Sequence, residues 1–326
     1  MESKMKKTLG YIRNGKWFKV ATANSVILVA ILVIIAAWIM EPNTFMTAQN
    51  WVNILRSNAT VGILAFGMTF VIISGEIDLS VGSALVAVGA ITMFVLNVTG
   101  SVFVAVLVAL VVGALFGTMT GFIVAKGRVP SFIVTLGLMY IYRSVSMYYM
   151  KGGGFFGEVE GYKAISNTLI GGFLPLPIIY FAILVAACIY LAKYTKLGRH
   201  IYAVGSNKKS ARLSGINTDR IKILTFMLMG LAVALASIIE TSRMNSINAT
   251  SSGQGYEMNA IAMAVLGGAS MAGGRGTMVG TLFGILIMGI INNILTLVGV
   301  DPFLVNAIKG LIVILAVLLQ TKEKER

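Results

Sequence analysis

Charged side chains are scarce in this sequence. They make up 12% of the 326 residues, whereas about a quarter is usual in soluble globular domains. Hydrophobic residues account for 57% of the chain. This composition excludes a soluble globular protein and indicates an all-α polytopic membrane protein. A transmembrane barrel is also excluded, because the apolar runs are continuous over about twenty residues, whereas barrel strands are short and alternating.

Residues that build disulfides, metal centres and nucleotide sites are equally rare. The single cysteine, Cys188, has no partner for an intrachain disulfide, and the single histidine, His200, has no cluster of metal ligands around it. No G-x-x-x-x-G-K-[ST] motif occurs, and the glycine-rich residues 266–277 lack the preceding strand of a dinucleotide loop. We find no catalytic triad either. The sequence therefore predicts no enzyme site, no metal and no bound cofactor.

The apolar runs predict ten membrane spans. The 36 glycines, against five prolines, indicate that these helices pack closely. The run at 259–269 is short, so it either crosses the membrane or is re-entrant. The ten runs are residues 20–40, 51–74, 80–98, 102–125, 131–149, 174–191, 223–239, 259–269, 277–298 and 303–319.

Basic residues orient these spans. The longest polar interval, residues 193–222, contains eight Lys and Arg residues and one acid, Asp219. Loops rich in Lys and Arg stay on the cytoplasmic side, and ten crossings then place both ends of the chain there. We expect a cytoplasmic tail at residues 1–19, a transmembrane domain at residues 20–320 and a second tail at residues 321–326. Basic residues at span ends also explain the net charge of +14 without a nucleic-acid partner.

The basic interval contains a candidate short helix at residues 208–214. Gly205 and Gly215 flank this segment as helix breakers, and Ser206 and Asn207 precede it as candidate capping residues. A capped helix in a cytoplasmic loop is a candidate contact for a partner protein.

Two glycine ladders have a helical spacing: Gly113, Gly117, Gly121 and Gly276, Gly280, Gly284. Each ladder predicts a groove along one helix face, where a second helix can approach closely. With ten crossings the two ladders run in opposite directions across the membrane. One interpretation is an inverted repeat of two five-helix halves. The other is that such ladders are common in membrane helices and imply no repeat.

A polar break, SGEIDLSVGS, interrupts the apolar pattern at residues 74–83. An acid at membrane depth is unfavourable by about 2.5–3.5 kcal/mol, so Glu76 and Asp78 should face protein or water. One interpretation is a broken helix whose N-terminus, capped by Asp78 or Ser80, borders a solute pathway. The other is a tight cytoplasmic turn with Asp78 as the N-cap and Glu76 in solvent.

Other polar groups are candidates for the same pathway. Residues 240–262 are rich in Asn, Ser, Thr and Gln, and they either bind polyhydroxylated solutes at the outer mouth or form a solvated loop. Asparagines within the apolar helices should mainly form interhelical hydrogen bonds. The candidate pathway residues are Ser74, Glu76, Asp78, Ser80, Arg143, Arg243, Asn245, Asn292 and Asn293.

At four segments the sequence resembles the permease subunits of bacterial ATP-binding-cassette importers for monosaccharides, the ribose, galactose and xylose permease family. The ribose branch is the most similar. Two departures bear on the substrate: the family usually has glycine at the position of Glu76 and often aspartate at that of Asn259. The segments are IDLSVGS (77–83), GRHIYAVGSNKKSARLSGIN (198–217), GYEMNAIAMAVLGGASMAGGRGTMVGT (255–281) and GIINNILTLVGV (289–300).

The resemblance implies a pair of permease subunits, two cytoplasmic ATPase subunits that bind ATP and Mg²⁺, and a periplasmic or lipid-anchored sugar-binding protein. It places the chain in the bacterial inner membrane. It also implies that a short cytoplasmic helix docks on the ATPase, and residues 208–214 are the part of the chain suited to this. The residues expected to couple to the ATPase are Gly205, Asn207, Lys208, Ser210, Ala211, Arg212, Leu213, Ser214 and Gly215.

A self-sufficient secondary transporter is the alternative. In that case Glu76 or Asp78 would carry a coupling proton or sodium ion, since both acids lie beside a predicted helix break. The basic interval would then serve only to orient the spans.

Overall fold

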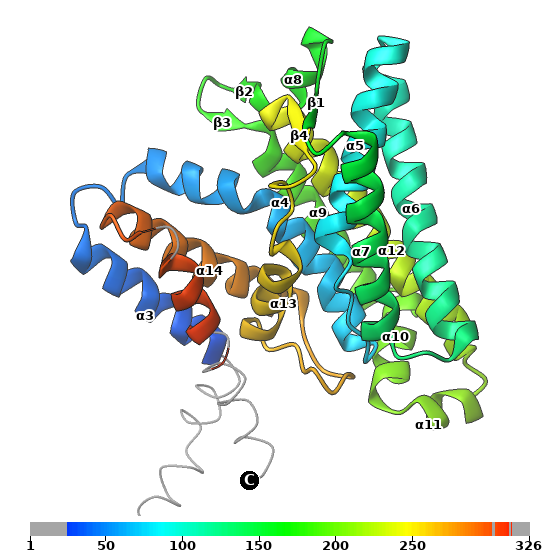
Figure 1. Cartoon of the computed structure of the whole chain (residues 1–326). Coiled ribbons are helices and arrows are strands. Elements are labelled where there is room, and N and C mark those ends of the chain that lie inside the picture. Colours follow the sequence, from blue (N-terminus) through cyan, green and yellow to red (C-terminus); the bar gives the residue numbers. More distant parts are fainter. Residues whose placement is uncertain (1–24, 302–303, 313, 315–326) are drawn as a thin grey trace, which may run out of the picture.

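The computed structural model describes residues 25–301, 304–312 and 314. Within them the chain forms a bundle of long helices with two very small sheets (Figure 1). The helices are α3 (Ser25–Met40), α4 (Ala48–Ile73), α5 (Val81–Thr99), α6 (Val102–Gly127), α7 (Ser131–Tyr149), α8 (Glu160–Asn167), α9 (Leu176–Tyr194), α10 (Lys196–Ser206), α11 (Lys208–Leu213), α12 (Thr218–Met244), α13 (Tyr256–Leu266) and α14 (Met278–Leu297). The strands are β1 (Gly154–Phe156), β2 (Leu169–Ile170), β3 (Leu174–Pro175) and β4 (Ser246–Asn248).

The helices α4, α5 and α12 form the centre of the bundle. Their apolar side chains are buried on nearly every face; Leu64, Val88 and Ala234, for example, are fully buried. By contrast, α6 and α7 keep large apolar side chains at the surface, and Phe122 and Phe132 are 56% and 51% exposed. An extended exposed apolar surface indicates contact with a membrane.

Among the described residues, six helices are long and apolar enough to cross a membrane: α4, α5, α6, α9, α12 and α14. They correspond to six of the ten predicted runs. The run at 131–149 is α7, which has 19 residues but is not among these six. The helix α13 has 11 residues, and at 1.5 Å per residue it covers about half of a hydrocarbon core. The run at 303–319 is helical at residues 304–312 and 314, where the structure describes it. The rest of this run and both predicted tails lie outside the described residues.

The first glycine ladder forms a groove on α6, and the helix that packs in it is α12. A methyl group on Gly117 would lie 2.2 Å from the Phe226 carbonyl oxygen, and one on Gly113 would lie 2.5 Å from the Gly230 carbonyl oxygen. Gly121 meets the backbone of Ile223 in the same way. The two helix backbones therefore approach as closely as small residues allow.

The second ladder packs α14 against α13, but over a shorter length than predicted. Gly280 and Gly284 lie against the backbone of Gly267 and Met263. Gly276 is not part of the helix, because α14 begins at Met278 and is capped by the preceding threonine.

The two ends of the bundle are built differently. The end that carries α8 has both sheets, with β1 antiparallel to β4 and β2 antiparallel to β3. Figure 1 shows this α8 end at the top and α10 and α11 at the bottom. Sequence reasoning did not anticipate the sheets or α8, because strands of two or three residues leave no periodic pattern.

Candidate functional site

The short helix α11 agrees closely with its predicted position. The Asn207 side chain caps it by accepting a hydrogen bond from the Ser210 amide at 3.0 Å. Gly215, at φ +82°, ends the helix, and the amide of the next residue donates to the Ala211 carbonyl at 3.0 Å. Only glycine adopts this left-handed conformation without strain. The predicted N-cap, Asn207, and the predicted helix breaker, Gly215, therefore both act as expected. The helix ends at Leu213, one residue earlier than predicted, and Ser214 is its C-cap.

One face of α11 is free. Ala211 is buried against the rest of the chain, whereas the Leu213 side chain is 89% exposed. Lys208, Ser210 and Arg212 are exposed as well. Hence Leu213 is available to a partner protein, and Ala211 is not.

A second helix, α10, precedes α11 and was not predicted. Thr195 caps it by accepting from the Gly198 amide at 3.1 Å, and Ile201 and Val204 are buried. The Tyr202 hydroxyl donates to the Gly276 carbonyl at 2.7 Å, and burial raises the pKa of this tyrosine, which keeps the hydroxyl protonated as a donor. The predicted loop at 193–222 thus contains two helices as well as the end of α9 and the start of α12.

Four glycines join α10 to two other segments, and we name them the glycine junction: Gly75, Gly205, Gly273 and Gly274. A methyl group on Gly205 would lie 1.7 Å from the Ile73 carbonyl oxygen. The Gly274 amide donates to that same oxygen at 2.8 Å. A methyl group on Gly273 would lie 2.7 Å from the Gly205 carbonyl oxygen. Backbone atoms, without intervening side chains, therefore make the contacts between the end of α4, the end of α10 and the loop before α14.

The role of Gly205 differs from the prediction. It lies inside α10 as its penultimate residue, so it does not break a helix before α11. Glycine is needed at this position because a side chain would prevent the close approach of α10 to the end of α4 and to the loop before α14. Sequence reasoning missed Gly273 and Gly274, which it considered only as part of a possible nucleotide loop.

Residues 74–80 connect α4 to α5 without helical structure. The Ser74 hydroxyl donates to the Val71 carbonyl at 2.7 Å. Asp78 is buried, and its Oδ1 accepts from the amide and the hydroxyl of Ser80, at 2.9 and 2.6 Å. The residue at the N-cap position of α5 is Ser80, so Asp78 precedes the cap and does not occupy it.

The connection enters the interior of the bundle. Asp78 and Ser80 line a cavity of about 10 Å³, enough for roughly one water molecule, together with Gly117 of α6 and Gly230 of α12. Both glycines lie near the middle of helices long enough to span a membrane. This arrangement agrees with the broken-helix interpretation of the segment.

The Glu76 side chain is largely buried. It forms an ion pair with Lys222 of α12, and the two side chains are 10% and 12% exposed. The pair links the α4–α5 connection to the helix that follows α11. The solvated-turn interpretation of Glu76 is therefore wrong: the compensating charge comes from a residue distant in sequence.

Neutralising one partner of this pair should destabilise the protein. We expect Glu76→Gln or Lys222→Gln to lower the free energy of unfolding by about 2–3 kcal/mol, because each leaves a poorly solvated charge without a partner. The loss is less than for a fully buried pair, since both residues also border an open cavity. The double variant should recover most of the loss. Thermal or denaturant unfolding of the purified chain measures the stability of the two single variants and the double variant, and Lys209→Gln serves as the control. If the losses of the two single variants simply add in the double variant, the two residues are not paired.

Arg143 binds the backbone of the segment between β4 and α13. Its Nη1 donates to the carbonyls of Ala249 and Ser252, at 2.8 and 2.9 Å. The same stretch packs on the start of α5, where a methyl group on Gly82 would lie 2.2 Å from the Gly253 carbonyl oxygen. The first turns of α5 and α13 therefore lie side by side.

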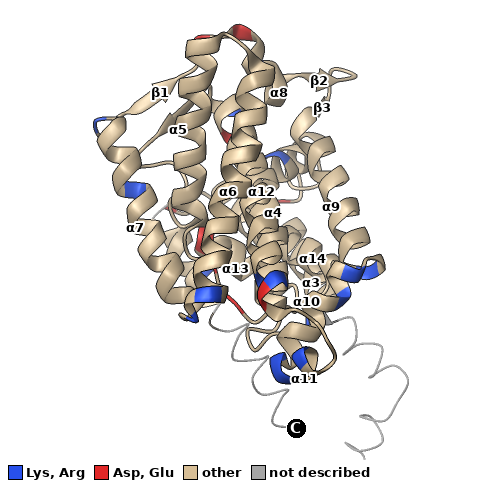
Figure 2. Cartoon of the chain, turned by 90° about the vertical axis from the view of Figure 1, so that its right-hand side faces the viewer, with Lys and Arg blue, Asp and Glu red and all other residues tan. Residues whose placement is uncertain are grey.

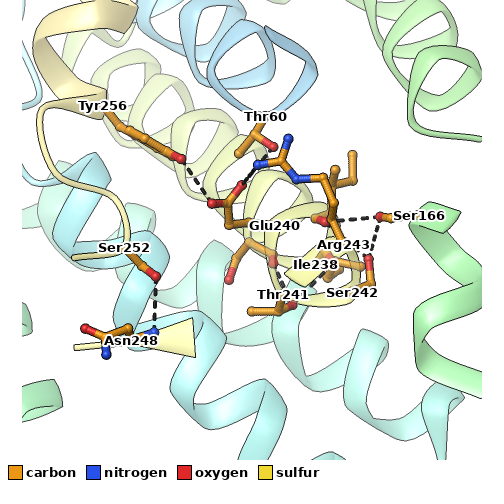
Figure 3. A network of polar contacts seen from close by, with 12 residues as sticks. Thr60, Ser166, Ile238, Glu240, Thr241, Ser242, Arg243, Asn248, Ser252 and Tyr256 are labelled. Carbon is orange, nitrogen blue, oxygen red and sulfur yellow. Dashed lines mark hydrogen bonds and ion pairs between the residues drawn. The ribbon is translucent and has the colours of Figure 1, made fainter. Parts of the chain in front are cut away.

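A buried polar network ties α12 to α4 and α13 (Figure 3). The Glu240 carboxylate accepts from Tyr256 at 3.0 Å, from Arg243 at 3.1 Å and from Thr60 at 3.3 Å. Glu240, together with the next two residues, is buried inside α12. This corrects the prediction of a polar loop beginning at residue 240, since the helix continues to Met244.

The remaining candidate pathway residues make separate pairwise contacts. Asn245 donates through its amide to the Gly157 carbonyl at 2.8 Å. Asn293 of α14 exchanges two hydrogen bonds with Asn50 of α4, at 2.8 and 3.0 Å, as expected for an interhelical contact. Asn292 is half-exposed on the same helix. Of the nine candidates, Asp78 and Ser80 line the small cavity described above, and Glu76 lines a separate, larger cavity.

Comparison with known proteins identifies relatives of nearly full length. The chain is 44% identical to the ribose import permease protein RbsC of Escherichia coli K12 over 304 residues, which cover 91% of this chain and 93% of the relative. It is 39% identical to the ribose import permease protein RbsC of Bacillus subtilis, over 90% of each chain. The xylose transport system permease protein XylH of Escherichia coli K12 is 33% identical, over 86% of this chain and 87% of the relative. No solved structure matches the chain.

A protein-family model covers most of the chain as well. The model described as branched-chain amino acid transport system / permease component matches residues 50–317. Proteins named in this way are transport components and not catalytic subunits. Together with six helices able to cross a membrane, this identifies a multi-pass inner-membrane protein. The chain belongs to the family of branched-chain amino acid transport system / permease components.

Proposed function

We propose that this chain is the permease subunit of an ATP-driven importer that moves a ribose-like monosaccharide into the cytoplasm. The names of the relatives suggest the class of substrate. The observation that carries the proposal is α11, a capped helix with an exposed Leu213, attached at its start to the glycine junction. A transport protein without an ATP-binding motif needs such a contact to receive energy from an ATPase.

The geometry provides a path from α11 to the interior. A displacement of α11 moves α10, and the glycine junction leaves no gap between α10, the end of α4 and the loop before α14. The Glu76–Lys222 pair adds a link from α12 to the α4–α5 connection. Closure of the ATPases would thus shift the segments around Asp78 and Gly253 and switch the pathway between outward and inward access.

We further propose the full membrane arrangement. Ten crossings with both ends in the cytoplasm fit the distribution of charge, because Lys and Arg gather toward the α11 end (Figure 2). Residues 1–19 and 321–326 would be cytoplasmic tails, residues 20–320 the transmembrane domain and residues 193–222 the coupling loop. The packing of α6 on α12 and of α14 on α13 through glycines is compatible with an inverted repeat.

The partners follow from the family. Cytoplasmic ATPase subunits would bind and hydrolyse ATP with Mg²⁺, and a solute-binding protein would deliver the sugar at the α8 end. A second copy of this chain would complete the pathway.

The contacts of Glu76 and Asp78 argue against an ion-coupled transporter. Glu76 is already paired with Lys222, and Asp78 holds the backbone before α5 through Ser80. Both acids therefore have structural partners in place of a solvated ion path.

Transport in proteoliposomes tests the proposal. Vesicles containing this chain, the ATPase and the binding protein should take up ribose only when ATP is enclosed with the ATPase. Vesicles containing this chain alone, under a proton or sodium gradient, should take up none. Gradient-driven uptake without ATP would overturn the importer function. The same vesicles loaded with xylose test the substrate class separately.

A further inference from the structure

A cavity of about 390 Å³ opens at the α11 end of the chain. It lies between the end of α6, the α6–α7 loop, α11 and the start of α12, and Glu76 of the α4–α5 connection also lines it. The site lies apart from the Leu213 side chain, which is not in its lining.

The lining of this cavity carries excess positive charge. Arg128, Lys208, Arg212 and Lys222 face two acids, Glu76 and Asp219. Glu76 is paired with Lys222, and Asp219 lies 3.6 Å from Arg212 and 3.7 Å from Lys126. Arg128 and Lys208 form no ion pair with any residue that the structure describes.

Two further features describe Lys208 and Arg128. Partial burial, and then repulsion by Lys222, lower the pKa of Lys208, although Asp219 and Glu76 attract its charge. Arg128 is the C-cap of α6 and has the left-handed backbone, at φ +54°, that commonly ends a helix, so its position at the cavity is set by the end of α6. An anion in the cavity would offset the repulsion between Lys208 and Lys222.

We propose that this cavity binds a phosphate-bearing anion through Arg128 and Lys208. Arginine binds phosphate by paired hydrogen bonds and lysine as a point charge. The cavity is also lined by Val129 and Pro130, and exposed apolar residues of α7 follow directly, Phe132 and Ile133. In the proposed topology, on which this assignment rests, the opening borders both the cytoplasm and the lipid, and the phosphate belongs to a soluble phosphate monoester or to a lipid headgroup. Once bound, it would link α11 to the α6–α7 loop.

Two probes on the purified full chain test the site. Glycerol 3-phosphate is titrated calorimetrically, and phosphatidylglycerol is compared with phosphatidylcholine by native mass spectrometry. We expect one probe to bind and the double variant Arg128→Asn/Lys208→Gln to bind it at least about tenfold more weakly. Asparagine is chosen because it tolerates the left-handed backbone.

Two matched variants separate the site from general charge effects. Arg128→Lys/Lys208→Arg keeps the charges and should retain binding. Lys196→Gln/Lys209→Gln removes two exposed charges that do not line the cavity and should bind like the wild type. Binding of glycerol 3-phosphate identifies a soluble ligand, and preference for phosphatidylglycerol over phosphatidylcholine identifies a lipid. Binding of neither probe, or equal weakening in both charge-removing variants, would overturn the proposal.

Discussion

Replacing Gly205 by alanine should largely abolish ATP-dependent uptake while leaving the ATPase bound. The added methyl group would lie 1.7 Å from the Ile73 carbonyl oxygen and 2.8 Å from the Gly274 amide nitrogen. Both are backbone atoms, so the end of α10 must separate from α4 and from the loop before α14. Overpacking of this kind is unfavourable by about 1–3 kcal/mol. Applied to the coupling between two sites, that energy corresponds to a loss of roughly 5- to 150-fold in uptake.

A second glycine provides the matched control. A methyl group on Gly137 of α7 would meet nothing within 4 Å, so Gly137→Ala should transport normally. Uptake and ATP hydrolysis are measured in the same proteoliposomes. We expect Gly205→Ala to hydrolyse ATP with little uptake, because α11 itself is unchanged. Uptake at the wild-type rate would show that the glycine junction does not transmit movement.

Local signals allowed α11 and the glycine groove of α6 to be predicted from the sequence, although not the helix that packs in this groove. The cap of α11 depends on Asn207 and its end on Gly215, and both act on residues at most four positions away. The four-residue spacing of Gly113 and Gly117 is enough to predict a groove along one face of the helix. In each case the physical cause lies within one turn or one helix face.

Contacts between distant segments could not be predicted in this way. The partner of Glu76 is 146 residues away, and nothing near residue 76 indicates whether its charge is solvated or paired. The glycine junction brings together three segments whose glycines look like ordinary turn residues in isolation. The helix α10 was missed because its basic residues marked the interval as a loop, although Ile201 and Val204 have helical spacing.

The candidate pathway residues show the same limit. Polarity within an apolar run identified Asn293 correctly as a residue that forms an interhelical hydrogen bond. It marked Arg143 only as a candidate pathway residue, and the hydrogen bonds of Arg143 to Ala249 and Ser252 were not predicted. Polarity alone does not distinguish a side chain that holds two segments together from one that contacts a solute. The contacts of Arg143 with the backbone before α13 make it a positioning residue in this chain.

Replacing residues 208–215 by a Gly-Ser linker of equal length should abolish copurification of the ATPase subunits. The linker removes α11 with its cap and its end but leaves α10 at the glycine junction and Lys222 on α12. The membrane helices should therefore fold normally, which size-exclusion chromatography and unfolding of the purified chain would verify. Affinity purification through a tag on this chain measures the loss of the ATPase.

A single substitution makes the same test without altering the backbone. Leu213 is 89% exposed, so Leu213→Ser should leave the stability of the isolated chain unchanged. Burial of a leucine side chain at an interface is worth about 1.5–3 kcal/mol, and its loss should weaken ATPase binding roughly 10- to 100-fold. Lys209→Gln on the same helix is the control and should copurify normally. Because Ala211 is buried within the chain, its substitution would report folding, whereas weakened copurification of Leu213→Ser reports contact with the partner. Full copurification of both the linker variant and Leu213→Ser would show that the ATPase binds elsewhere.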